Sequence, residues 1–270
     1  MNDTPRTMRL LPALALTGAL LIGGCGDDDS DTAEKDDTST TAAAAEDASV
    51  EAACGAYTDI SAAMSGEPEG DPAAWFKKTI VPLADELDAN KPADIDAELT
   101  TMVDTVNKVA ESGDMSGFED PAFSEAQGTV DPYMFENCDF DQKVEVSGKE
   151  YSFEGLSDEM AAGETAILFT NDGMEAHEIV VASKKDGVTE SFEELLELPE
   201  EEAMTKINMM GGTFAPQKGD QGLMVADLVP GEYAALCFIP TGTTMGEDGE
   251  KPGDGPPHFT QGMMTEFTVS

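Results

Sequence analysis

Histidine is nearly absent from this sequence, in which only His177 and His258 occur among 270 residues. A scattered use of histidine to adjust surface charge is therefore excluded. Basic side chains are scarce as well, because 14 Lys and Arg stand against 56 Asp and Glu, for a net charge of −42. Nucleic acid and anionic membrane surfaces are poor partners for such a chain. A basic protein would be attracted, although a generally acidic surface suited to a saline habitat is the simpler explanation.

The N-terminus has the features of an export signal. Arg6 and Arg9 precede an apolar run from Leu10 to Ile22 that is too short to span a bilayer as a permanent helix. The run ends in Ile22-Gly-Gly-Cys25, which resembles the lipobox of bacterial lipoproteins. This resemblance implies a signal peptide over residues 1–24 and a lipid on Cys25, which would anchor the protein to the cell membrane outside the cytoplasm. An ordinary secretory signal with a chance cysteine is the alternative.

Three further segments are expected after the signal peptide. Residues 25–49 are acidic and contain no large apolar side chain, so we expect a disordered tether. Residues 50–140 have helical periodicity and form a predicted small helical domain. Residues 141–270 have the short apolar runs of strands. The predicted fold class is α+β, with a helical domain followed by a Greek-key β-sandwich that carries a helical insertion.

Helix boundaries are indicated by capping residues and prolines. Asp71 and Pro72 predict an N-cap and a first turn, and Pro82 should kink or divide the helix that follows. Another helix is expected from about Pro92 to Gly113. Asp131-Pro132 is expected to open a short last turn.

The sandwich strands are separated by turn residues, and a helical insertion interrupts them. The insertion is expected to start with the capping box of Ser191, and a second helix is expected from Pro199 to Gly211. Pro230-Gly231 is expected to turn a hairpin. The predicted strands are 143–146, 151–153, 166–169, 179–182, 223–228, 233–238 and 265–269.

The four cysteines divide into separate roles once export is accepted. If Cys25 carries lipid, three thiols remain in an oxidising compartment. Cys54 and Cys138 bracket the helical region, and a disulfide between them would stabilise the fold by roughly 4 kcal/mol. Cys237 is then left over, and a lone thiol outside the cytosol is a liability unless a soft metal holds it.

His177, Cys237, His258 and Met263 are the side chains expected to bind a metal. They lie at strand ends and in loops late in the chain. Two imidazoles, one thiolate and a weak thioether are the ligands of a mononuclear blue-copper site. Such a set suits Cu(I) and Cu(II) about equally poorly, so electron transfer needs little rearrangement. Zinc is less favoured, because a thioether is a poor zinc ligand.

Over residues 141–270 this arrangement resembles the plastocyanin/azurin (cupredoxin) family of blue-copper proteins. The resemblance implies one type 1 copper held by His177, Cys237, His258 and Met263, and single-electron transfer as the function. Two features differ from the usual family pattern. Twenty residues, Phe238 to Pro257, separate Cys237 from His258. Glu178 stands where the family commonly has an Asn that braces the site.

Several alternatives remain at this point. The fold can be a cupredoxin that has lost its metal, and Met264 competes with Met263 as the axial ligand, although strand alternation turns it to the opposite side. Five methionines could form a cluster that binds Cu(I): Met204, Met209, Met210, Met224 and Met245. The spacing of Met204, Met209 and Met210 also suits a helix packed on the sandwich, and this is the preferred interpretation.

The sequence therefore predicts a lipid-anchored, extracytoplasmic copper protein that carries electrons and is not an enzyme. Copper oxidases and nitrite reductases need further histidines, and both histidines are already assigned. Its partner would be a redox protein outside the cytoplasm. The alternatives are a lipoprotein that sequesters copper or delivers it to a copper-handling protein, and a metal-free binding module on a cupredoxin scaffold.

Overall fold

The computed structural model describes residues 38–65, 71–246 and 249–270. Ser39–Ser270 forms one compact unit, so the helical part and the strands, predicted as separate domains, pack together. The expected signal peptide, Cys25 and the tether up to residue 37 lie outside the described residues.

The first helix, α1 (Thr38–Met64), begins earlier than the sequence predicted. The expectation of disorder up to Ser49 is wrong for residues 38–49, which are helical. Four consecutive alanines, residues 42–45, lie in this segment. Because alanine has the highest helix propensity, the helix can extend here without a large apolar side chain.

The next helices follow the predicted caps. Asp71 caps α2 (Pro72–Trp75), and its Oδ1 accepts a hydrogen bond from the Ala74 N–H at 2.9 Å. A π-helical turn, η1 (Phe76–Ile80), then leads into α3 (Val81–Ala89), which has Pro82 in its first turn, so the helix changes type next to this proline but does not end there. After η2 (Ala93–Ile95), α4 (Asp96–Ser112) ends at Gly113, whose φ of 73° favours glycine.

The last of these helices, α5 (Pro121–Asn137), follows η3 (Met115–Glu119) and runs through Pro132. The prediction that Asp131-Pro132 starts a separate turn is therefore wrong. Val130 and Met134 flank the proline and are both 0% exposed. Their packing keeps the helix continuous despite the backbone hydrogen bond that a proline removes.

Two sheets form the sandwich. The first has the strand order β2-β1-β4-β7 and the second has the order β3-β11-β8-β5-β6. The pairs β1–β4 and β3–β11 are parallel and the other pairs in these two sheets are antiparallel. The strands of the first sheet are β1 (Gln142–Lys149), β2 (Ser152–Glu154), β4 (Gly163–Asn171) and β7 (Gln221–Leu228). Those of the second are β3 (Glu159–Met160), β5 (His177–Lys184), β6 (Ile207–Ala215), β8 (Gly231–Leu236) and β11 (Met264–Val269).

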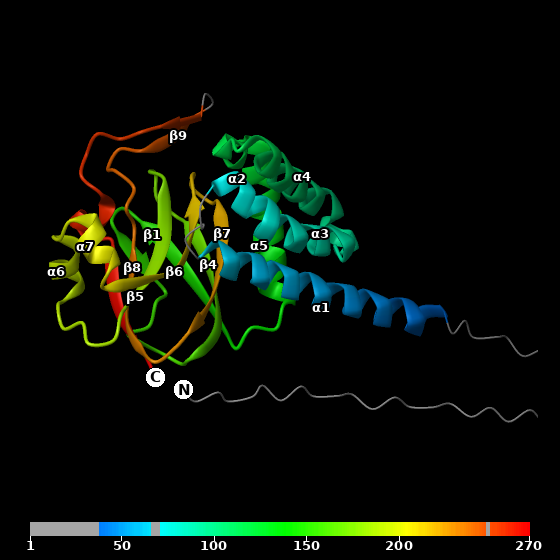
Figure 1. Cartoon of the computed structure of the whole chain (residues 1–270), viewed down its shortest axis with the longest axis horizontal. Coiled ribbons are helices and arrows are strands. Elements are labelled where there is room, and N and C mark those ends of the chain that lie inside the picture. Colours follow the sequence, from blue (N-terminus) through cyan, green and yellow to red (C-terminus); the bar gives the residue numbers. More distant parts are fainter. Residues whose placement is uncertain (1–37, 66–70, 247–248) are drawn as a thin grey trace, which may run out of the picture. The chain divides into compact units, whose positions relative to one another are not determined.

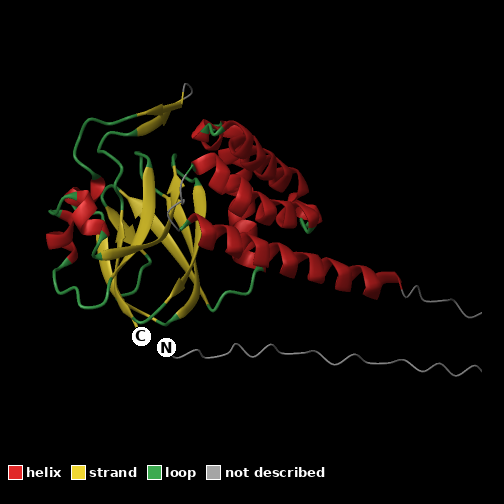
Figure 2. Ribbon diagram, in the orientation of Figure 1, coloured by secondary structure: helices red, strands yellow, loops and turns green. Residues whose placement is uncertain are grey.

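Strand alternation connects the layers. On β4, Ile167 and Phe169 belong to the core between the sheets, while Ala166 and Leu168 belong to the cluster formed with the helices. Figure 1 and Figure 2 show α1–α5 beside β4 and β7, and α6 (Phe192–Leu196) and α7 (Glu200–Met204) beside the other sheet. Both faces of β4 are thus buried in its middle, which explains the uninterrupted apolar run from Ala166 to Phe169.

Two predictions about the strands are wrong. Residues 207–215 form β6 and not the end of a helix, because β5 provides a pairing edge, and Met210 is the extra residue of a bulge beside Gly211 at φ 133°. The chain also does not form a hairpin at Pro230, since β7 pairs with β4 and β8 pairs with β5 and β11. The connection crosses between sheets, and the Tyr233 hydroxyl donates to the Val229 carbonyl at 2.8 Å beside it.

The predicted disulfide is present. Cys54 on α1 bonds to Cys138, which follows α5, across 84 residues of chain. Among the helices within 38–65, 71–246 and 249–270, none has both the length and the apolar character needed to cross a bilayer.

Candidate metal centre

His177, Cys237 and His258 meet in the interior at one end of the sandwich. Each is 0% exposed, and their potential ligand atoms all lie within 4.8 Å of one another. The Nδ1 atoms of the two imidazoles are 3.1 Å apart, and Cys237 Sγ is 3.3 Å from His258 Nδ1. Two ring nitrogens and one sulfur therefore converge on a common point.

The second sheet places the first two of these residues. His177 is the first residue of β5, and Cys237 follows the last residue of β8. The antiparallel register sets Val180 opposite Leu236, so the start of β5 and the end of β8 lie at the same end of the sheet.

His258 reaches the same point because the long segment after Cys237 closes on itself. Pro240 and Pro257 form an antiparallel bridge, and the His258 N–H donates to the Ile239 carbonyl at 2.9 Å. The Phe259 N–H then donates to the Cys237 carbonyl at 2.9 Å. The intervening chain forms a small two-stranded sheet, β9 (Thr244–Gly246) with β10 (Gly249–Lys251), at the top of Figure 1. The twenty-residue separation is thus a hairpin inserted between two ligand positions that remain adjacent.

Met263 is tied to this group through its backbone and is 0% exposed. Its N–H donates to the His258 carbonyl at 3.1 Å, and its carbonyl accepts from the Cys237 N–H at 3.2 Å. Met263 shares a core cluster with Cys237, whereas Met264 packs in the cluster that contains Phe192 of α6. The two methionines therefore face opposite sides, as strand alternation predicted, and the role of Met263 as axial ligand stays a prediction.

Two carboxylates stand behind the imidazoles. Glu175 Oε2 lies 3.0 Å from His258 Nε2, and Glu175 Oε1 accepts a hydrogen bond from the Tyr151 hydroxyl at 3.2 Å. Glu150 Oε1 lies 3.7 Å from His177 Nε2 and accepts hydrogen bonds from the Met174 and Glu175 N–H groups, the latter at 2.9 Å.

The surroundings keep both carboxylates ionised. Burial alone would raise the pKa of Glu150, but hydrogen bonds from the backbone outweigh it and lower this pKa to about 2. Burial also opposes ionisation of Glu175, yet hydrogen bonds from the Gly242 N–H, His258 and Tyr151 lower its pKa. Both side chains therefore carry negative charge at neutral pH.

The same surroundings favour uncharged forms of two of the converging groups. Burial and the neighbouring His258 lower the pKa of His177. Burial raises the pKa of the Cys237 thiol to about 12. The thiolate thus needs a cation at the site to compensate its burial, which links metal binding to proton release.

Buried polar groups brace the loop before His177. Asn171 is 0% exposed, and its Nδ2 donates to the carbonyls of Glu175 and Ala215 at 2.8 and 2.9 Å. Its Oδ1 accepts from the Gly173 N–H at 2.8 Å. Glu178 holds the other side, since its Oε1 accepts from the Phe238 N–H at 2.9 Å. Asn171 on β4 and Glu178 on β5 together fix the chain around two of the converging residues.

These residues fit a bound metal ion. His258 can give its Nε2–H to Glu175 and keep the Nδ1 lone pair for a metal. His177 Nε2 is buried without a hydrogen-bond partner, because Glu150 Oε1, at 3.7 Å, lies beyond hydrogen-bond distance. Two imidazoles and a thiol that converge from adjacent strand ends match the expected ligand order. The C-terminal part of the chain is thus a two-sheet β-sandwich with three of the expected ligands brought together at one end.

Comparison with known proteins gives matches only among solved structures. No family model and no curated protein matches the chain. Reduced auracyanin from Roseiflexus castenholzii is 17% identical with a TM-score of 0.30, over 48% of this chain and 96% of that one. Auracyanin A, a "blue" copper protein from Chloroflexus aurantiacus, is 14% identical with a TM-score of 0.31, over 47% and 98%. Rusticyanin from Thiobacillus ferrooxidans is 16% identical with a TM-score of 0.29, over 47% and 77%.

The sequence predicted His177, Cys237 and His258, and the fold brings all three together. The sequence did not identify Glu150, which reaches the site from the turn after β1, or Glu175, which lies two residues before His177. Neither had a distinguishing signal among 56 acidic residues. Of the methionines considered for Cu(I), Met224 lies in the core between the sheets and Met209 packs near α6, so these two fill hydrophobic clusters.

Proposed function

We propose that this protein binds one type 1 copper ion through His177, Cys237 and His258, with Met263 as a weak axial ligand, and carries single electrons. The observation that carries the proposal is the convergence of two Nδ1 atoms and one Sγ in a fully buried site. Copper would supply the Cu(I)/Cu(II) couple. The protein supplies fixed donors, a dry environment and closely hydrogen-bonded loops that limit rearrangement.

Electron transfer is favoured over copper delivery by the way the site is closed. Delivery needs ready ligand exchange, but the three donors are 0% exposed. The chain on both sides of the inserted hairpin is hydrogen-bonded through Ile239 and Thr241, which pair with His258 and Pro256. Opening the site would break these bonds. Slow release of metal and fast transfer of electrons are therefore expected together.

We further propose that the protein acts outside the cytoplasm, anchored through a lipid on Cys25. The lipobox-like sequence supports the anchor, and the Cys54–Cys138 disulfide supports an oxidising compartment. The partner would be a redox protein with a positively charged surface, because the chain carries a charge of −42. Met174 and Phe238, which are 76% and 38% exposed on the loops beside His177 and Cys237, would offer apolar contacts.

The decisive experiment loads Cu(II) into residues 25–270 with Cys25→Ser. An intense blue absorption that is lost in Cys237→Ser, together with reversible voltammetry, is the expected result. Protein that stays colourless and retains no copper would refute the proposal. The anchor is tested separately in the full chain, where Cys25→Ser should abolish labelling by a radioactive fatty acid and move the protein from the membrane to the soluble fraction.

A further inference from the structure

Each imidazole of the metal centre has a carboxylate near its Nε2 atom. Glu175 is hydrogen-bonded to His258 Nε2 at 3.0 Å, and Glu150 lies 3.7 Å from His177 Nε2. Neither carboxylate converges on the common point of the Nδ1 and Sγ atoms. They are therefore not ligands, but they face the ligand rings on the side away from the metal.

The local structure holds these carboxylates in place. Glu150 accepts hydrogen bonds from two successive N–H groups of the loop before His177. Glu175 is held by Tyr151, whose ring lies 4.9 Å from the His258 ring, and by the Gly242 N–H. Gly173 lacks a side chain where a Cβ would come within 2.6 Å of both His177 Nε2 and Glu150 Oε1. The glycine thus permits the close approach of carboxylate and imidazole.

We propose that Glu150 and Glu175 are positioning residues that lower the reduction potential of the bound copper through their charge, and that Glu175 also selects the Nε2–H tautomer of His258. This rests on the proposed function. A carboxylate that accepts the Nε2–H directs the Nδ1 lone pair to the metal and makes the imidazole a stronger donor. Two negative charges beside the ligands stabilise Cu(II) more than Cu(I), since the oxidised site carries the larger positive charge.

The test compares Cu(II) and Cu(I) affinities and the reduction potential in Glu175→Gln and Glu150→Gln. Each variant should lower the ratio of Cu(II) to Cu(I) affinity about tenfold, which corresponds to a rise of about 59 mV in potential. Glu266→Gln is the matched control. Glu266 is exposed on β11, and its replacement by Gln removes one negative charge from the same domain. Glu175→Asp keeps the negative charge, so its reduction potential should rise less than that of Glu175→Gln.

The outcomes separate this proposal from the proposed function. Wild-type protein that binds no copper would refute the function. A blue wild-type protein whose potential is unchanged in Glu175→Gln and Glu150→Gln, or changes equally in Glu266→Gln, would refute the positioning role alone. Absorption and electron paramagnetic resonance spectra supply a further readout, since a change of tautomer or ring orientation alters the copper spectrum, whereas a loss of general stability does not.

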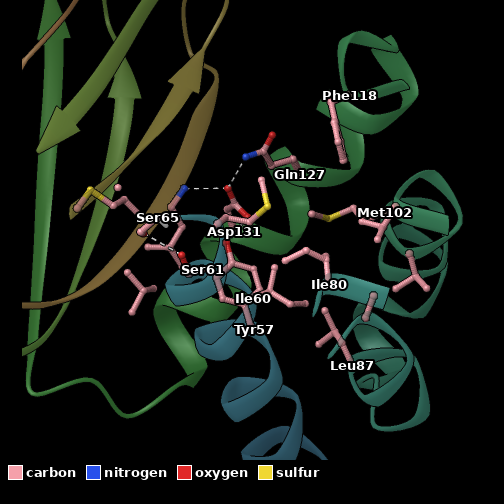
Figure 3. Close-up of a pocket in the computed structure, with 18 of the residues that line it drawn as sticks. Tyr57, Ile60, Ser61, Ser65, Ile80, Leu87, Met102, Phe118, Gln127 and Asp131 are labelled. Carbon is pink, nitrogen blue, oxygen red and sulfur yellow. Dashed lines mark hydrogen bonds between the residues drawn. The ribbon is translucent and has the colours of Figure 1, made fainter. Parts of the chain in front are cut away.

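A second and independent feature is a cavity of about 450 Å³ between the helices and the first sheet. Its walls come from α1, η1, α3, α4, α5 and the neighbouring β6 and β7, and apolar side chains predominate. Figure 3 shows Ile60, Ile80, Leu87, Met102 and Phe118 around it. The volume lies within the usual range for small-molecule sites.

The main polar group in the lining of this cavity, the Asp131 carboxylate, already has hydrogen-bond partners within the protein. Asp131 Oδ1 accepts from the Tyr57 hydroxyl at 2.7 Å. Its Oδ2 accepts from Gln127 Nε2 at 3.0 Å and from the Leu223 N–H at 2.8 Å. Among the described residues, the lining contains no Lys, Arg or His. A bound anion would therefore find no positive partner and would face a buried acid in a strongly acidic protein.

We infer that this cavity binds an uncharged, predominantly apolar small molecule. Apolar walls without an ion-pairing group favour a neutral ligand over a fatty-acid anion or an amine. Occupancy would restore the van der Waals contacts that an empty apolar space lacks, and would stabilise the folded state by mass action.

Fluorescence of N-phenyl-1-naphthylamine in the presence of the protein tests this inference. Wild-type protein should bind the probe saturably, and 1-dodecanol should displace it at least tenfold more effectively than dodecanoate or dodecylamine. Ala84→Phe, which fills the cavity from α3, should abolish binding, while Ala89→Phe on the exposed side of α3 should not. Absence of saturable binding in the wild type, or equal displacement by dodecanoate, would overturn the inference even if Ala84→Phe fails to fold.

Discussion

Cys237 Sγ lies 3.3 Å from His258 Nδ1, although twenty residues separate the two along the chain. The bridge between Pro240 and Pro257 makes this possible, because it returns the chain to the sheet before His258. The length of the inserted segment is thereby uncoupled from the geometry of the site. A long loop costs little additional closure entropy once its two ends are fixed.

Thr243 supports the base of this inserted segment, and its loss should loosen the metal centre. Its Oγ1 donates to the Pro240 carbonyl at 2.7 Å and accepts from the Gly253 N–H at 2.9 Å, and the residue is 1% exposed. Thr243→Val should cost about 1 kcal/mol of unfolding free energy, since it removes the acceptor of the partly buried Gly253 N–H and the hydrogen bond to the Pro240 carbonyl. Urea unfolding measures this cost. Copper release to a chelator should become faster, and an unchanged release rate would contradict the supporting role.

Gly173 is predicted to be essential for metal affinity. In Gly173→Ala the new Cβ would stand 2.6 Å from His177 Nε2, so the ring must move. We expect a loss of about 10–100-fold in copper affinity, measured by competition with a chelator. Gly128→Ala on α5 is the control, because a Cβ there meets nothing within 4 Å. That control should leave copper binding unchanged and stabilise the helix by about 0.5–1 kcal/mol.

Asp131 should make the folded state less stable as the pH rises. Burial raises its pKa from 3.8 to about 6, so the folded protein binds more protons than the unfolded chain between these values. Its contribution to the free energy of unfolding is therefore greatest below pH 4 and falls by about 3 kcal/mol as the pH passes 6. Unfolding curves of the wild type and Asp131→Asn across this range test the sign.

The difference between these two proteins isolates Asp131 from the many other acidic groups. Asn at this position does not titrate, so the free energy of unfolding of the wild type minus that of Asp131→Asn should decrease as the pH rises from 4 to 7. Asp227→Asn, exposed on β7, should show no such trend. A difference that grows with pH would contradict the raised pKa.

The Cys54–Cys138 disulfide should contribute to stability without contributing to the metal centre. Replacing both cysteines by Ala should lower the free energy of unfolding by roughly 4 kcal/mol, because the bridge closes a long loop in the unfolded chain. The copper absorption of the folded protein should remain unchanged, since Cys237 is the only free cysteine in the described part of the chain. A loss of blue colour in folded protein would instead connect the helices to the site.

The sequence by itself determined the features that depend on residue type and short spacing. These are the change from helices to strands near residue 141, the caps at Asp71, Gly113 and Ser191, the disulfide and the three converging ligands. Local hydrogen bonds and turn preferences specify the caps, whereas the disulfide and the ligands could be predicted because the chain has so few cysteines and histidines. The scarcity of histidine made the ligand prediction sharp, because only two were available.

Tertiary structure decided what depends on pairing between distant segments. Residues 207–215 can satisfy helical or strand spacing, and only the edge of β5 selects the strand. The chain crosses between sheets at Pro230 because β4 and β5 offer separate partners to β7 and β8. Glu150 and Glu175 become neighbours of the imidazoles only after the turn after β1 and the loop before β5 are brought together. Hydrophobic burial and strand register act over the whole fold, and no local pattern encodes them.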